Sequence, residues 1–247
     1  MSTRTRTKNY APTPDSDRSP YIIGGLAILV IAALIIGGVL WTNSKNKPRN
    51  DGYGSVQNPD VAVSVQDNGV VLLSKPTAAQ TIDLFADPLC PACAALEHLS
   101  GQALASAVDN GDVAVRYHML NFLDRSSGSR DYSTRAGAAL LSVANSGDAL
   151  AYSAFHARLF TPDTQPHEGG RTDHSNDDLA VIAREAGASE EVAKRISSGS
   201  DVEAAAANAA AASQALKATG AVGTPTVVAN DKVVDTRNGD WVSALSS

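Results

Sequence analysis

Cysteine is nearly absent from this sequence: its 247 residues contain only Cys90 and Cys93. Two thiols separated by two residues can close a disulfide, but so short a loop gives that bond little power to stabilise the fold. The chain-entropy relation gives about 2 kcal/mol for such a loop, against about 4.7 kcal/mol for a loop of 100 residues. The pair is therefore predicted to be a reversible redox centre rather than a structural crosslink.

Basic runs and aromatic side chains are also scarce. The net charge is −6, aromatic residues make up 5% of the chain, and no long basic stretch follows the first residues. Nucleic-acid-binding domains carry a basic face, so we expect no nucleic-acid partner. Alanine is abundant in the second half of the chain, which favours closely packed helices over an all-β sandwich.

Long uncharged runs are rare too, with one exception at residues 21–41. A helix of that length spans about 31 Å, which matches the hydrocarbon core of a bilayer. Tyr21 and Trp41 fall at the two interfaces, where such rings are enriched. The alternative is a cleavable signal peptide, whose apolar region has about 7–15 residues before a small-residue cleavage site. This run is longer and ends in Val39-Leu40-Trp41, so we expect an uncleaved anchor.

The orientation follows from the flanking charges and from the thiol pair. The segment before the run carries slightly more basic residues than the segment after it, which places the N-terminus in the cytoplasm. Stable disulfide chemistry belongs outside the cytoplasm, which gives the same orientation. We therefore expect a single-pass cell-membrane protein with a disordered cytoplasmic tail at 1–20, a flexible linker at 42–60 and an extracytoplasmic catalytic domain at 61–246.

Apolar periodicity predicts the elements of that domain. Strands are expected at 61–65 and 70–73, joined by a turn at 67–69, and then at 81–85, 112–120, 226–229 and 232–234. Helices are expected at 90–110, 133–145, 148–160, 177–186, 189–197, 201–218 and 241–245. Gly111 ends the first helix, and Asn176, Ser189 and Ser200 are expected as caps of later ones.

The order of these elements indicates the fold. The strand, helix and strand between residues 81 and 120 form a β-α-β unit, whose crossover implies parallel strands. A helical block at about 125–220 follows, and then a strand hairpin. This α/β arrangement matches a thioredoxin-like fold interrupted by an α-helical insertion subdomain, preceded by one N-terminal transmembrane helix.

The thiol pair lies where the strand pattern at 81–85 gives way to a helix. Backbone N–H groups and the helix dipole stabilise a thiolate at a helix N-terminus, the position of Cys90. Pro91 suits the first turn, where a missing N–H costs nothing. Cys93, one turn further in, can attack a mixed disulfide on Cys90. The alternative is half of a zinc site, but a closed site needs four ligands and no second cysteine pair exists.

A second motif, Gly223-Thr224-Pro225-Thr226, directly precedes a predicted strand. An X-Pro bond takes the cis form at a cost of only about 0.5–1 kcal/mol. With a cis Pro225, the Thr224 backbone would face an extended peptide, as in strand addition.

Together, Cys90-Pro91-Ala92-Cys93 and the Thr224-Pro225 motif resemble the DsbA-like thiol-disulfide oxidoreductases of thioredoxin fold. Supporting matches lie at Tyr152–Phe160 and Asp178–Ala180, and the resemblance covers about 61–245. It implies disulfide formation in reduced secreted proteins through the Cys90–Cys93 disulfide, and we expect no bound cofactor or metal. No dimerisation domain is evident in the sequence, so we expect a monomer. The resemblance also implies a quinone-linked membrane partner that re-oxidises the pair, either DsbB-like or similar to vitamin K epoxide reductase.

Two positions depart from the pattern of that family. Ala92 replaces a histidine that helps to stabilise the thiolate in DsbA, so we predict a Cys90 pKa between roughly 3.5 and 7. Leu84 stands where family members often bury an acid beneath the pair. Asp83 is one residue away, and strand alternation puts it on the opposite face. Asp87 lies next to the motif and could move protons, although such loop acids are commonly plain caps.

Other polar residues are assigned no chemistry. His98 and His118 are expected to have solvated or packing roles. The residues His167, Glu168, Asp173 and His174 are expected to be a solvated loop cluster rather than a metal site. Two functions compete with thiol oxidation: a thioredoxin-like reductase or isomerase, and a non-catalytic holdase that binds peptides along the proline loop.

Overall fold

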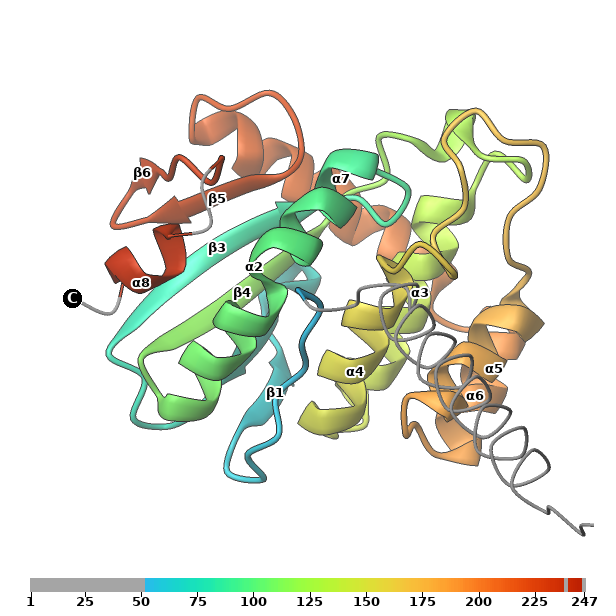
Figure 1. The fold of residues 1–247 in the computed structure, drawn as a ribbon. Coiled ribbons are helices and arrows are strands. Elements are labelled where there is room, and N and C mark those ends of the chain that lie inside the picture. The colour runs from blue at the N-terminus through green and yellow to red at the C-terminus, as the bar shows by residue number, and fades with distance from the viewer. Residues whose placement is uncertain (1–51, 238–239, 246–247) are drawn as a thin grey trace, which may run out of the picture. The chain divides into compact units, whose positions relative to one another are not determined.

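The computed structural model describes residues 52–237 and 240–245 (Figure 1). Its centre is a six-stranded sheet with the order β1-β2-β4-β3-β5-β6. The strands are β1 Ala62–Val65, β2 Val71–Ser74, β3 Gln80–Ala86, β4 Val113–Met119, β5 Thr226–Ala229 and β6 Lys232–Val233. β3 and β4 pair in parallel and every other neighbouring pair is antiparallel, which confirms the predicted strands and the β-α-β unit.

The predicted tail, membrane anchor and first part of the linker lie outside the described residues. Among the residues that are described, no helix is both long enough and apolar enough to cross a membrane.

The helix that carries the thiol pair, α2, spans Pro91–Asn110 and connects β3 to β4. Cys90 is its N-cap residue and Pro91 stands at its start, as predicted. The helix ends at Gly111, whose φ of 82° lies in the left-handed region that glycine adopts without a Cβ penalty. The hairpin turn between β1 and β2, η1 at Asp67–Gly69, is a short 3-10 helix.

Strand alternation divides the sheet into two packed faces. On β3, Ile82 and Leu84 belong to the main core, whereas Phe85 points to the other side. That second side is covered by the alanine-rich helix α7, Val202–Ala218, through Ala212 and Leu216. Figure 1 shows α2 and the closing helix α8, Trp241–Leu245, in front of the sheet, with α7 behind it.

The remaining helices lie beside the sheet and carry much of the core (Figure 1). They are α3 Tyr132–Asn145, α4 Ala149–Leu159, α5 Asn176–Glu185 and α6 Glu190–Ser197, preceded by the 3-10 turn η2 at Asp124–Ser126. All of the predicted helices are present within two residues of the expected bounds. The aromatic side chains of Tyr132 on α3, of Tyr152 and Phe155 on α4, and of Phe160 at the end of α4 are fully buried.

Two of the three predicted caps are wrong, and Ser189 is confirmed. Ser175, not Asn176, caps α5, because its hydroxyl and the Asp178 carboxylate form a reciprocal capping box. Asp201, not Ser200, is the N-cap residue of α7. Its carboxylate binds Ser142 and Arg195 instead of the helix N–H groups, so tertiary contacts hold that end.

Candidate active site

The two predicted motifs meet at one end of the sheet. β3 and β5 pair with Phe85 opposite Thr226, so the segments that follow β3 and precede β5 lie next to each other. The Cys90 thiol lies 3.6 Å from the carbonyl oxygen of Thr224, to which it can donate. The Thr224-Pro225 peptide bond is cis, as predicted from the sequence.

Cys90 combines partial shielding with several hydrogen-bond donors. The thiol of Cys93 is the strongest of these, and Thr224 and the backbone N–H groups of Cys93 and Ala92 add to it. These donors favour the thiolate and outweigh burial, so they lower the pKa of Cys90 to about 6. The value lies inside the range predicted from the sequence, although Ala92 replaces the family histidine.

Cys93 has the opposite character. It is 2% exposed on the inner face of α2, and burial is the main cause that raises its pKa well above the ordinary value. The charge and the accepted hydrogen bond of Cys90 raise it further. Both cysteines are unpaired in this structure. The motif therefore contains one thiol poised to ionise and one kept protonated, as expected for an attacking and a resolving thiol.

Asp87 is more than a surface cap, because it is fully buried beside the redox turn. Its carboxylate accepts hydrogen bonds from the Ser133 hydroxyl at 2.6 Å, from Leu89 N–H at 2.9 Å and from Leu123 N–H at 3.0 Å. Burial still dominates and raises the pKa of Asp87 to about 6, and the nearby Cys90 charge acts in the same direction. A buried carboxyl that titrates near neutral pH thus lies next to the thiols.

The residue that follows Asp83 on β3 is the apolar Leu84, at the position where family members often bury an acid. Leu84 is buried in the main core, and Asp83 lies on the other face of the sheet. There Asp83 binds Arg116 at 2.6 Å and His118 at 2.7 Å, and His118 stacks on Phe85. The structural role expected for His118 is confirmed. The Asp83 carboxylate binds Arg116 and His118 on the face of the sheet away from the thiols.

Glu97 is a buried acid that the sequence analysis missed. It lies four residues after Cys93 on the same buried face of α2, about one helical turn away. Its carboxylate lies 3.8 Å from Nδ1 of His156. Burial raises the pKa of Glu97 to about 7 and lowers that of His156 to about 3, so the histidine is neutral at pH 7. The only sequence signal was an acid at an inward-facing position of an amphipathic helix.

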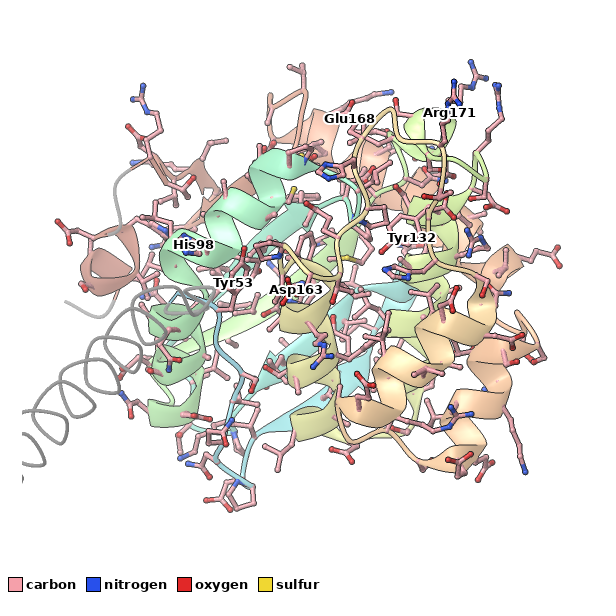
Figure 2. The ribbon with its side chains drawn as sticks, turned by 45° about the vertical axis from the view of Figure 1, so that its right-hand side comes forward. Tyr53, His98, Tyr132, Asp163, Glu168 and Arg171 are labelled. Carbon is pink, nitrogen blue, oxygen red and sulfur yellow. The ribbon has the colours of Figure 1, made fainter. Side chains whose placement is uncertain are left out.

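The polar loop between α4 and α5 agrees only in part with the expected solvated cluster. His167 and Glu168 are exposed, and Figure 2 shows Glu168 on that loop with Arg171. Asp173 is not solvated, because its side chain is 4% exposed and binds Arg135 at 2.7 Å. His98 is exposed on α2 and packs its ring against Tyr53 (Figure 2).

Comparisons with known proteins agree with this site. Residues 67–245 match the family described as thioredoxin. The structure is similar to the MdbA thiol-disulfide oxidoreductase of Corynebacterium diphtheriae, with 33% identity, a TM-score of 0.68, and coverage of 81% of this chain and 99% of that one. It is also similar to DsbA of Mycobacterium tuberculosis, with 28% identity, a TM-score of 0.56, and coverage of 76% and 98%.

One relative is a longer protein, and this chain resembles only one part of it. The chain is 38% identical over 185 residues to the serine/threonine-protein kinase PknE of Mycobacterium tuberculosis, a match that covers 75% of this chain. The match covers only 32% of that kinase, so the resemblance is to one part of it. The family match, the similarity to MdbA and DsbA, and the two motifs indicate the same family. The chain belongs to the thioredoxin family and, within it, to the DsbA-like thiol-disulfide oxidoreductases.

Proposed function

We propose that this protein introduces disulfides into reduced secreted proteins by dithiol-disulfide exchange at Cys90 and Cys93. One observation carries the proposal: Cys90 starts a helix, faces Thr224 and has a pKa lowered to about 6, whereas Cys93 is buried behind it. A stabilised thiolate favours the reduced form of the pair, and a stable reduced form makes the disulfide a stronger oxidant.

The exchange proceeds in two displacements. A substrate thiolate attacks Cys90 Sγ of the oxidised pair, the Cys90–Cys93 bond breaks, and Cys93 leaves as a thiolate that takes up a proton. A second substrate thiolate then attacks the substrate sulfur of the mixed disulfide and releases the Cys90 thiolate. The substrate loses two electrons and gains a disulfide, and the cysteine pair gains the two electrons.

The substrate is an extended peptide segment placed against the proline loop. The Thr224 backbone beside Cys90 can pair with such a segment as an added strand would. Val222, two residues earlier, is 92% exposed and offers an apolar contact next to the same loop.

The cellular setting that we propose rests on the sequence. The run at 21–41 anchors the protein in the cell membrane with its N-terminus in the cytoplasm, and the redox domain acts as a monomer outside. A quinone-linked membrane protein, DsbB-like or similar to vitamin K epoxide reductase, takes the electrons from the reduced pair. The redox group is the cysteine pair itself, with no bound cofactor.

The test uses Cys90→Ser and Cys93→Ser variants with a reduced model protein as the substrate. We expect Cys90→Ser to abolish oxidation, because it removes the sulfur that is attacked. Cys93→Ser should instead trap a mixed disulfide on Cys90 that is visible by non-reducing electrophoresis. A holdase would keep its peptide binding in both variants and show no exchange in the wild type.

The reduction potential separates oxidase from reductase. A value near −120 mV, as in DsbA, is expected for an oxidase, and one near −270 mV, as in thioredoxin, would assign the protein to the reductases.

A further inference from the structure

Gln165, in the loop between α4 and α5, contacts the redox turn directly. Its side-chain amide nitrogen donates to the carbonyl oxygen of Pro88 at 3.0 Å and to that of Cys90 at 3.1 Å. Pro88 is buried, so its carbonyl needs a partner inside the protein. One amide group from the helical insertion thus binds backbone on both sides of Leu89, immediately before α2.

A tight turn at the end of α4 holds Gln165 in place. The Thr161 carbonyl accepts from the N–H groups of Thr164 and Gln165, at 3.0 Å and 2.8 Å. The Thr161 hydroxyl also donates to the Thr164 hydroxyl at 3.2 Å. The Gln165 amide therefore starts from a backbone that is already ordered, so binding the redox turn costs side-chain entropy but no further backbone entropy.

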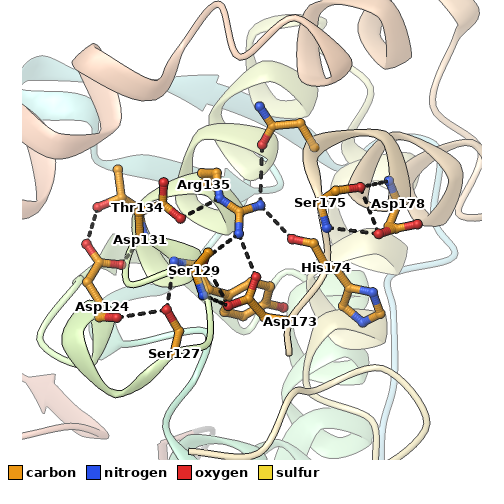
Figure 3. Close-up of polar contacts among 12 residues, drawn as sticks. Asp124, Ser127, Ser129, Asp131, Thr134, Arg135, Asp173, His174, Ser175 and Asp178 are labelled. Atoms are coloured by element: carbon orange, nitrogen blue, oxygen red, sulfur yellow. Dashed lines mark hydrogen bonds and ion pairs between the residues drawn. The ribbon is translucent and has the colours of Figure 1, made fainter. Parts of the chain in front are cut away.

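The far end of the same loop is fixed to α3 (Figure 3). Arg135 donates to the His174 carbonyl at 2.5 Å and to the Asp173 carboxylate at 2.7 Å. His174 Nε2 lies 2.7 Å from the Thr164 carbonyl, and because a carbonyl only accepts, Nε2 carries the proton. A continuous series of contacts thus runs from Arg135, 10% exposed on α3, to the backbone of Cys90.

These contacts act on the groups that stabilise the thiolate. Ala92 and Cys93 N–H groups favour the Cys90 thiolate only while the first turn of α2 keeps them directed at Sγ. The carbonyl oxygens of Pro88 and Cys90 carry partial negative charge in the same turn as that sulfur. When Gln165 binds them, it holds the turn in register and offsets that charge. The Cys90 carbonyl also accepts from the N–H groups of Cys93 and Ala94, at 3.0 Å and 3.2 Å, so it stays in the helix without Gln165. The Pro88 carbonyl instead loses the Gln165 contact and gains freedom to turn, and the thiolate loses stabilisation.

We propose that Gln165 is a positioning residue of the redox centre, through which the helical insertion keeps the Cys90 thiolate stabilised. It touches no reacting atom and acts through the backbone on both sides of Leu89. The inference rests on the proposed role of Cys90 as the attacking thiol.

The test compares Gln165→Leu, which keeps the bulk and removes both donors, with the wild type in the full chain. We expect the Cys90 pKa, followed by thiolate absorbance, to rise by about one unit, and alkylation below that pKa to slow about tenfold. The reduction potential should fall by about 30 mV, the value of a tenfold change in the exchange equilibrium. Gln102→Leu is the matched control, because Gln102 is exposed on α2 and its side chain contacts Ser106.

An unchanged pKa and potential in a folded Gln165→Leu protein would overturn the proposal. If that variant does not fold, Gln165→Asn replaces it, since its amide is one methylene too short to reach both carbonyls. The same rise in the Cys90 pKa is expected there, and a wild-type pKa again refutes the role. Failure of the proposed function would look different: the wild type itself would show no thiolate at Cys90 near neutral pH.

Discussion

The lowered pKa of Cys90 predicts how the stability of the reduced protein depends on pH. The folded pKa is about 6, against an ordinary value of 9.0 for the unfolded chain. A depressed pKa means that the folded state releases the proton first. Stability from this thiolate is therefore complete above pH 9 and is lost as the pH falls through 6. The perturbations that test it are the pH and the substitution Cys90→Ser.

The magnitude follows from the two pKa values. At pH 7 the shift is worth about 1.4 kcal/mol of unfolding free energy, and above pH 9 the full three units approach about 4 kcal/mol. Both are upper values, because Cys90 adjoins the exposed residues Pro91 and Ala92 and solvent screens part of the interaction. Asp87 and Glu97, with folded pKa values of about 6 and about 7, also titrate near this window, and the comparison with Cys90→Ser removes their contribution because that variant keeps both acids.

The assay is urea unfolding of the domain, kept reduced, at several pH values. The wild type should gain stability from about pH 6 to about pH 9 relative to Cys90→Ser, by up to about 4 kcal/mol. The oxidised wild type has no thiolate and serves as the second control. If the reduced wild type and Cys90→Ser ran parallel across this window, the assignment of a stabilised thiolate to Cys90 would be wrong.

Three further substitutions test the polar groups around the pair. Asp87→Asn should remove a fall in stability of about 3 kcal/mol between pH 3.8 and 6, because a folded pKa raised to about 6 favours the protonated carboxyl, and parallel urea-unfolding profiles would contradict the burial of Asp87. Glu97→Gln should remove a fall in stability of about 3 kcal/mol between pH 4.5 and 7, because a folded pKa raised to about 7 favours the protonated form. Parallel wild-type and variant profiles in that window would show that Glu97 is not shielded from water. Arg135→Met removes the counter-ion of the buried Asp173 carboxylate, which keeps only the hydrogen bonds from Ser129, and should cost about 3–5 kcal/mol by thermal or urea unfolding, with Arg158→Met as an exposed control.

Much of the fold could be predicted because its signals are local. Alternation along β3 placed Leu84 inside and Asp83 outside, and the glycine at 111 marked the end of α2. The thiol pair and the Thr224-Pro225 motif are short sequence patterns whose geometry is set by the elements next to them. The cap at Ser175 was missed by one residue, since Ser175 and Asn176 are both good caps and only the Asp178 contact decides between them.

The rest of the site depends on contacts between distant segments. Asp87 is an ordinary loop acid in the sequence, and its burial arises only when Ser133 and Leu123 fold against it. Gln165 lies 75 residues from Cys90, and no periodicity connects the two. Such residues become visible only once the helical insertion is placed against the redox turn.

The positions of the two buried acids have a mechanical consequence. Leu84 leaves the sheet beneath the thiols without a carboxyl group, while Asp87 and Glu97 lie on the same continuous segment as Cys90 and Cys93. The two sulfurs and the two acids therefore belong to one stretch of backbone. Asp87 is also held by Ser133 and Leu123, whereas Glu97 lies on α2 itself. A displacement of α2 would therefore carry Glu97 along with the thiols and leave Asp87 behind.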